Sequence, residues 1–593
     1  MIHQINPCLI LGFLITVFTI SCSEISDEDN DAHPPNIILI MTDDQGHGDL
    51  GFHGNPDIKT PTLDSLAKIS TRFTQFYVSP VCAPTRASLM TGRYSIRTGV
   101  YDTYNGGAIM SDSELTIPER LKEKGYVSGV FGKWHLGDSY PFRPQDQGFD
   151  HSFVHSGGGI GQPGDYYENY IRPHDSYFDP VMRRNGDKVK TSGYCSDVFT
   201  EEMLEFIDNN KENPFFAYLA FNAPHTPLQV PENYYEMYSD LDINKMNYPE
   251  VGEFPEMNER NIEDARKVYG MVTNIDDNIK KIFDKLEISG LTKNTLLIFI
   301  TDNGPQQPRY VSGFRGRKGS VYEGGIRVPS FWYWQGVTKQ DYEIITPSAH
   351  FDIVPTLMDI CGLDLETSNN LDGKSLWPLL KGESVDWIER PIISHWTRGF
   401  TEPYHNVAVR KGSFKLVGHG DYRMAEDDFE LFNMDENPYE TVDISDQFPD
   451  MVTDLKQEFD DWYDDVMQSP NHVPLRIQVG SEFENPVVLN RNDTKGPMAK
   501  RWTSPTALGY WDILVAEEGL YDIKTVYFEK FRSRGRASIL TGNTQRTIVN
   551  QDTSVNSIQF ENIELKKGDA MFQAWYEDYG RIMAPILVEI KKK

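Results

Sequence analysis

Four short apolar runs, each followed at once by charged or polar residues, constrain the fold of this chain most strongly. They are Asn36–Met41, Val127–Phe131, Phe215–Phe221 and Leu296–Ile300. Continuous apolar runs of this length are typical of strands that are buried on both faces of a sheet. Segments with helical spacing alternate with them, at Pro61–Ile69, Ile117–Lys124, Asp197–Asn209, Glu259–Leu286 and Asp352–Cys361. Strands that alternate with helices predict an α/β fold with a large, mostly parallel sheet flanked by helices.

The residues that follow the four runs predict a functional site. They are Asp43 and Asp44, then Lys133 and His135, then His225, and finally Asp302 and Asn303. Any one of them alone is better explained as a turn or cap residue. In open α/β sheets, however, ligands bind beyond the carboxyl ends of the strands, so we expect these side chains to converge on one rim. The carboxylate and amide oxygens among them suit Ca²⁺ or Mg²⁺.

A further segment, Val81–Arg93, predicts a helix that begins near Cys82. Pro84 is tolerated in a first helical turn, and Gly92 can end the helix. A cysteine at a helix N-terminus is a candidate reactive group, because the exposed N–H groups favour negative charge there. The alternative is a small buried thiol.

These motifs together resemble the type I sulfatases of the alkaline phosphatase-like superfamily. The resemblance spans Pro35 to Leu363 and extends more weakly to Met467. It rests on the motifs Thr42-Asp43-Asp44-Gln45-Gly46, Cys82-Ala83-Pro84-Thr85-Arg86 with Thr91-Gly92-Arg93, Gly132-Lys133-Trp134-His135-Leu136-Gly137, Pro224-His225-Thr226-Pro227, Thr301-Asp302-Asn303-Gly304, Arg315-Gly316-Arg317-Lys318-Gly319 and Glu323-Gly324-Gly325-Ile326-Arg327-Val328-Pro329.

The resemblance implies hydrolysis of sulfate esters and a role for each motif residue. A maturing enzyme would oxidise Cys82 to formylglycine (3-oxoalanine). One Ca²⁺ would be bound by Asp43, Asp44, Asp302, Asn303 and the modified Cys82. Arg86 and Lys133 would stabilise the aldehyde hydrate, while His225 and Lys318 would hold the sulfate and assist the leaving oxygen. His135 would remove the proton that allows sulfate to be expelled.

The charge of the chain limits its partners. A formal net charge of −31 argues against nucleic acid as a partner. An anionic substrate then requires a locally positive site. The basic residues Arg309, Arg315, Arg317, Lys318 and Arg327 are candidates for an anion clamp, and the alternative is a solvated loop.

The N-terminal segment predicts export. Residues 1–21 contain an apolar run that is too short to span a bilayer and has the length of a signal-peptide core. Thr19–Cys22 loosely resembles a bacterial lipobox, which would make Cys22 a lipid anchor followed by an acidic tether at 22–34. We therefore expect a periplasmic or cell-surface lipoprotein attached to the membrane only by its lipid, or otherwise a secreted protein.

Composition and pattern divide the rest of the chain. We expect a catalytic α/β domain at 35–372, an α+β subdomain at 373–470 and a β-sandwich at 475–593. Five cysteines are too few for a disulfide framework, and whether Cys195 pairs with Cys361 stays open.

The substrate is predicted to be a sulfated oligosaccharide or polysaccharide, algal or glycosaminoglycan. The segment His151–Asp175 resembles an insertion of bacterial carbohydrate sulfatases, and the alternative is a Gly-rich surface loop. Trp502, Tyr510, Trp511 and Trp575 could form a sugar platform or belong to the sandwich core. The rival functions are a phosphodiesterase or phosphonate hydrolase of the same superfamily and an inactive surface lipoprotein that binds glycans.

Overall fold

The computed structural model describes residues 34–365, 371–384, 387–420 and 425–593. The predicted signal peptide at 1–21 and all but Pro34 of the predicted tether lie outside the described residues. Pro35–Lys593 is one compact unit, and the description below concerns this unit. None of the helices in the described ranges is both long enough and apolar enough to cross a membrane.

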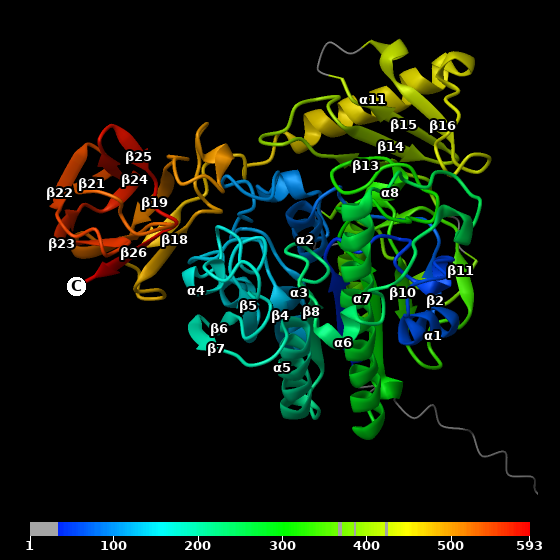
Figure 1. The fold of residues 1–593 in the computed structure, drawn as a ribbon. Helices are drawn as coiled ribbons and strands as arrows, with labels where there is room; N and C mark the ends of the chain where they lie inside the picture. Colours follow the sequence, from blue (N-terminus) through cyan, green and yellow to red (C-terminus); the bar gives the residue numbers. More distant parts are fainter. Residues whose placement is uncertain (1–33, 366–370, 385–386, 421–424) are drawn as a thin grey trace, which may run out of the picture. The chain divides into compact units, whose positions relative to one another are not determined.

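A ten-stranded sheet forms the centre of the catalytic part, with the four predicted strands in its middle (Figure 1). These strands are β1 (Asn36–Thr42), β4 (Val127–Lys133), β8 (Phe215–Ala220) and β9 (Thr295–Thr301). They are parallel neighbours in the order β9-β1-β8-β4. All their carboxyl ends therefore lie at one edge, which confirms the predicted α/β fold.

The outer strands of this sheet make it mixed rather than purely parallel. On one side lie β10 (Ser330–Tyr333), β2 (Thr71–Phe73) and β11 (Tyr342–Ile344), and on the other lie β5 (His151–His155), β6 (Val181–Arg184) and β7 (Asp187–Lys190). β10 runs antiparallel to β9, and β6 and β7 form an antiparallel hairpin beside β5. A two-stranded sheet is formed by β3 (Phe76–Tyr77) and β12 (Ser348–Ala349).

Helices cover both faces of the sheet. Alternate residues of β1 point to opposite sides, so each helical layer packs against a different set of them. Ile38 and Ile40 pack against one layer, which is α1 (Pro61–Ile69), α5 (Cys195–Asn210) and α7 (Glu259–Ile288). Ile37 and Leu39 pack against the other, which is α2 (Cys82–Thr91), α3 (Ile117–Leu121) and α9 (Ile353–Ile360). The short helices α4 (Tyr167–Tyr170), α6 (Glu232–Tyr235), α8 (Glu323–Ile326) and α10 (Trp377–Leu380) connect these elements.

The next part of the chain is a four-stranded antiparallel sheet with one long helix. It contains β13 (Ile392–His395), β14 (Val407–Lys411), β15 (Phe414–Gly418), β16 (Glu430–Asn433) and α11 (Pro449–Val466). A buried ion-pair triad joins this sheet to α8. The Lys415 Nζ lies 2.7 Å from a Glu323 carboxylate oxygen and 2.6 Å from a Glu440 carboxylate oxygen, and all three side chains are inaccessible.

Replacing Lys415 with methionine is expected to destabilise the protein by about 3–5 kcal/mol, because two buried carboxylates then lose their counter-charge. The measurement is the free energy of unfolding from denaturant titration. Lys411→Met is the matched control, since Lys411 pairs with Glu458 at the surface and its loss should cost less than about 1 kcal/mol. Equal effects of the two substitutions would contradict the assignment.

Residues 477–592 form two β-sheets that enclose a common core, as a β-sandwich does. One sheet contains β17 (Ile477–Val479), β19 (Trp511–Val515), β24 (Gly568–Asp578), β21 (Gly535–Thr541), β22 (Thr544–Asn550) and β25 (Arg581–Met583), and the other β18 (Val487–Asn490), β26 (Leu587–Lys592), β20 (Gly519–Val526) and β23 (Ser557–Leu565). Ile109 and Phe142 of the catalytic part pack into the same core. Trp511 is buried there and donates its indole N–H to the Asn490 carbonyl, so for this residue the core alternative is confirmed and the sugar platform is excluded.

Candidate active site

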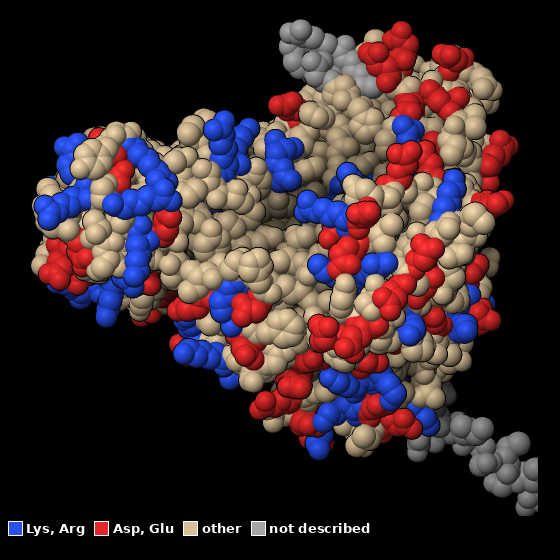
Figure 2. Space-filling model, in the orientation of Figure 1, with Lys and Arg blue, Asp and Glu red and all other residues tan. Residues whose placement is uncertain are grey.

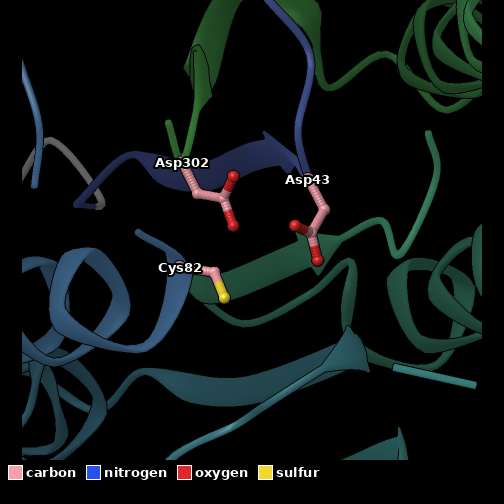
Figure 3. Close-up of side chains that lie close together, drawn as sticks. All are labelled: Asp43, Cys82 and Asp302. Carbon is pink, nitrogen blue, oxygen red and sulfur yellow. The ribbon is translucent and has the colours of Figure 1, made fainter. Parts of the chain in front are cut away.

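The carboxyl ends of the central strands bring the predicted residues together. Asp43 follows β1, Asp302 follows β9, and Cys82 opens α2 (Figure 3). Their side chains point toward one another, with the Sγ and carboxylate oxygens within 4.8 Å of one another. Asp43, Asp44 and His225 form a second, overlapping group that meets the same distance limit. Every member of both groups is buried.

Among the four side chains predicted to bind the metal at this rim, three oxygen atoms lack a hydrogen-bond partner. They are Asp43 Oδ1, Asp44 Oδ2 and Asn303 Oδ1. The other acceptor atoms are occupied, since Asp302 accepts from the Asp44 N–H at 3.1 Å and Asn303 donates to Asp44 Oδ1 at 2.8 Å. Unpaired buried oxygens are costly unless a cation or an ordered water satisfies them. This donor set fits a hard divalent cation such as Ca²⁺.

The carboxylates at this rim influence one another. Burial raises the pKa of Asp302, and the negative charge of Asp43 raises it further, to about 7. Burial opposes ionisation of Asp43 as well, but Lys133, His225 and Arg86 outweigh it and hold its pKa below the usual range. Clustered carboxylates remain ionised together only when positive charge lies among them.

Three basic side chains supply positive charge at the rim. Lys133 pairs with Asp43, and Lys318 Nζ lies 2.5 Å from Asp44 Oδ1. Arg86 donates to Asp302 Oδ2 at 2.9 Å and to the Lys133 carbonyl at 3.1 Å. These three cations balance the carboxylates of Asp43, Asp44 and Asp302. A bound divalent cation would then make the rim net positive, as an anionic substrate requires.

Cys82 is a buried, free cysteine at the start of α2. Burial raises the pKa of its thiol, despite the opposing charges of Lys133 and Lys318. A thiol with a raised pKa is a weak nucleophile, because the thiolate is the reactive form. The prediction that Cys82 needs chemical conversion is consistent with this environment.

His135 is held with one nitrogen toward Cys82. Its Nε2 lies 2.7 Å from the Thr103 carbonyl, and its Nδ1 lies 3.5 Å from Cys82 Sγ. A carbonyl can only accept, so Nε2 carries the hydrogen and Nδ1 presents its lone pair to Cys82. Burial, with Lys133, lowers the pKa of His135 well below its usual value, which keeps the ring neutral and able to accept a proton.

His225 and Lys318 lie on the Asp44 side of the site. His225 Nδ1 lies 2.7 Å from the Thr226 carbonyl, and its Nε2 lies 3.8 Å from Asp44 Oδ2. Burial and the charge of Lys318 lower the pKa of His225 to about 4. Burial also opposes the charge of Lys318, but Asp44 outweighs it and raises the pKa of Lys318. Lys318 therefore carries a proton in the unliganded site and His225 does not.

The predicted anion clamp is wrong for three of its five residues. Arg309 is buried and donates to Asp49 and to the Asp44 carbonyl. Arg315 bonds to Glu430, and Arg327 bonds to the Thr74 carbonyl. Their guanidinium groups hold protein segments together, which a sequence cannot distinguish from ligand binding. Arg317 remains exposed, and Lys318 is in the site.

The Gly-rich segment after β5 is a buried part of the site, not a surface loop. Residues 157–160 are buried, and a Cβ on Gly158 would lie 2.8 Å from His135 Nε2. Gly158 and the Thr103 carbonyl thus fix the position of His135. Sequence reasoning missed both contacts with His135. The glycine run marked the segment but not its contact with His135, and a backbone carbonyl leaves no signal in the sequence.

Cys195 and Cys361 are both free and buried, so they form no disulfide.

Comparisons with known proteins agree on one family. The sulfatase family model matches residues 35–363, and the model for the C-terminal region of N-sulphoglucosamine sulphohydrolase matches 315–465. Mouse N-acetylgalactosamine-6-sulfatase is 32% identical over 415 residues, which cover 64% of this chain and 71% of that protein. Mouse arylsulfatase J is 28% identical over 471 residues, covering 71% and 74%. The crystal structure of Ps i-CgsB in complex with k-i-k-neocarrahexaose matches with a TM-score of 0.63 and 30% identity, covering 74% of this chain and 94% of that chain.

Proposed function

We propose that this chain, which belongs to the sulfatase family and is a sulfuric ester hydrolase, acts on a carbohydrate. It would remove sulfate from a sulfated oligosaccharide or polysaccharide. The carbohydrate is supported by the relatives, one named for N-acetylgalactosamine-6-sulfate and one bound to a neocarrahexaose. The observation that carries the proposal is the convergence of Cys82, unpaired carboxylate oxygens and Lys318 at one rim.

The proposed cofactors are one Ca²⁺ and a formylglycine made from Cys82 by a maturing enzyme. Asp43, Asp44, Asp302 and Asn303 would hold the ion, which supplies positive charge against the sulfate oxygens when bound. The hydrated aldehyde supplies two hydroxyl groups on one carbon, one to attack sulfur and one whose deprotonation expels sulfate. Arg86, which is fully buried between Asp302 and the Lys133 carbonyl, would keep this side of the site in place.

The remaining work falls to side chains of this chain. Lys133 and Lys318 would neutralise sulfate oxygens, which otherwise repel a nucleophile. His135 would accept a proton at Nδ1, the nitrogen that faces residue 82. The leaving sugar oxygen would take its proton from Lys318 or His225. An anion beside His225 raises the pKa of that ring, so substrate binding itself would help to protonate it.

A turnover screen tests this function directly. The mature enzyme would be assayed on sulfated oligosaccharides, an aryl sulfate, a phosphate diester and a phosphonate ester. Release of sulfate from at least one oligosaccharide is expected. Preferred turnover of the phosphorus esters would favour the phosphodiesterase alternative. Absence of all turnover, with Cys82 still a thiol by mass analysis, would favour the inactive glycan-binding lipoprotein.

We also propose that the protein is exported, as a lipoprotein anchored through Cys22 or as a secreted protein. The support is the sequence of residues 1–22 alone. A mature N-terminus at Cys22 that carries lipid, determined by mass spectrometry of the native protein, is the expected result. An unprocessed Met1 in the native protein would contradict export.

Gly158→Ala is expected to lower kcat about 10- to 100-fold, because the added methyl group would displace His135 from residue 82. The measurement is sulfate release from an aryl sulfate at saturating substrate. Gly159→Ala is the matched control, since its Cβ would meet the flexible side chain of Gln162 instead. Wild-type kcat in Gly158→Ala would show that the position of His135 is not fixed by this loop.

A further inference from the structure

A cluster of aromatic and cationic side chains lies outside the catalytic group. We call it the Arg398 cluster, and it consists of Tyr104, Trp396, Arg398, Lys500 and Trp502. The guanidinium carbon of Arg398 lies 4.7 Å from the centroid of the Trp396 ring and 5.0 Å from that of Tyr104. Tyr104 in turn packs against Trp502, with ring centroids 5.5 Å apart. Three separate segments of the chain therefore meet here, and the last precedes β19 in the C-terminal part.

The Arg398 cluster adjoins the catalytic residues from two directions. Tyr104 directly follows Thr103, whose carbonyl binds His135. On the other side, the Asn406 side-chain amide donates to the carbonyls of Gly319 and Trp396, at 2.8 and 2.9 Å. Gly319 directly follows Lys318. The cluster is thus connected to His135 through the Thr103 carbonyl and to Lys318 through Asn406 and Gly319, so it lies beside two residues of the site.

The C-terminal segment is fixed against the catalytic part at this point. The Gly106 N–H donates to the Asn492 carbonyl at 3.1 Å, and the Tyr104 hydroxyl donates to the Lys500 carbonyl at 3.2 Å. Ile109 packs in the sandwich core just beyond this loop. These contacts hold Lys500 and Trp502 beside the loop that positions His135.

The cluster carries excess positive charge and is open to solvent. The Asp102 carboxylate is buried and accepts from Arg398 and from the Gly399 N–H, each at 2.8 Å. Arg398 nevertheless keeps 49% of its side chain exposed. Lys500 is exposed and forms no ion pair within the described residues. Asp102 thus balances the charge of Arg398, and the charge of Lys500 is left without a partner within the described residues. Figure 2 shows a hollow on this molecule with several Lys and Arg side chains around it.

We propose that the Arg398 cluster is a subsite for the sugar next to the one that loses its sulfate, and that it binds a second anionic group on the substrate. This inference rests on the proposed function. Tyr104 would support the ring of Trp502, which would pack against the apolar face of the sugar ring. Arg398 and Lys500 would bind the sulfate or carboxylate that this ring carries, since a guanidinium matches either group with paired hydrogen bonds. The substrate is then an oligosaccharide with at least two anionic groups, and the C-terminal part selects for it.

The test compares a large and a small substrate in the full-length, mature enzyme. The probes are a κ-neocarrahexaose sulfate, a chondroitin 6-sulfate hexasaccharide and 4-nitrocatechol sulfate, which has no second sugar ring to occupy the cluster. The variants are Lys500→Ala, Trp502→Ala and their combination. Arg398 is left intact, because its removal would leave Asp102 buried without its partner. Matched controls are Lys567→Ala and Tyr579→Ala, which remove an exposed lysine and an exposed aromatic side chain from the same C-terminal part.

The deciding quantity is the ratio of two values of kcat/KM. The first is for whichever of the two hexasaccharides the wild-type enzyme hydrolyses faster, and the second is for the aryl sulfate. We expect the double variant to lower this ratio about 30-fold, through KM rather than kcat, while both controls leave it unchanged. An unchanged ratio, or an equal loss on both substrates, would overturn the subsite and leave the proposed function standing. A wild-type enzyme that hydrolyses only the aryl sulfate would instead overturn the carbohydrate function itself, and this inference with it.

Discussion

Cys82→Ser is expected to lower kcat for sulfate esters at least about 10⁴-fold while the fold is retained, provided that the host does not oxidise serine. Serine differs from cysteine only in its Oγ atom, so the packing of α2 is preserved. Its hydroxyl cannot become the aldehyde hydrate, whose second hydroxyl group is needed to release sulfate. The measurement combines aryl sulfate turnover with the melting temperature of the purified variant.

Cys361→Ser is the matched control for this experiment. Cys361 is also buried and free, and its Sγ lies 3.2 Å from the Tyr126 hydroxyl, a contact that serine can reproduce. We expect Cys361→Ser to keep wild-type turnover. Mass analysis of the wild-type peptide should also show loss of the thiol only at residue 82. Wild-type activity in Cys82→Ser would sink the formylglycine proposal.

The part of the site that the sequence predicts lies at strand ends. Asp43, Lys133, His225 and Asp302 each come directly or closely after an apolar run. Parallel strands bring their carboxyl ends to a common edge whatever the intervening loops do. The convergence could therefore be inferred without knowing any long-range contact. The helices could also be predicted from the sequence, because the spacing of their apolar residues is a local pattern.

The parts that could not be predicted depend on contacts between distant segments. Arg309 belongs to a basic loop in the sequence, yet its guanidinium is buried against Asp49, 260 positions away in the chain. The Thr103 carbonyl orients His135, but a backbone acceptor leaves no mark on residue type. β10 and the β6–β7 hairpin are short and antiparallel, so neither length nor spacing marked them.

The location of the C-terminal aromatics illustrates the same limit. Trp502 and Trp511 are nine positions apart and equally aromatic. Trp511 lies in a strand and is buried in the sandwich core, whereas Trp502 packs against Tyr104 of the catalytic part. The difference arises from how the segment before β19 docks on the loop at 104–106. Only the folded structure contains that information.

Removal of Ca²⁺ is expected to abolish turnover and to lower thermal stability, and re-addition should restore both. The physical reason is the set of Asp43, Asp44 and Asn303 oxygens that are buried without a hydrogen-bond partner. At a free Ca²⁺ concentration 100 times the Kd, binding to the folded state alone contributes about 2.7 kcal/mol. The measurement is the melting temperature of chelator-treated enzyme against Ca²⁺ concentration, with turnover followed in parallel. The thermal readout does not depend on catalysis.

Asp302→Asn separates a specific site from general ionic effects. Its melting temperature should respond much less to Ca²⁺ than that of the wild type, because the amide removes one negative charge from the ligand set. Asp276→Asn is the matched control, since Asp276 accepts from the Thr62 and Leu63 N–H groups well away from the rim. This control should melt at a lower temperature but keep the full Ca²⁺ response. A melting temperature of the wild-type enzyme that does not change with Ca²⁺ would refute the metal site, because an ion that binds only the folded state must raise the melting temperature.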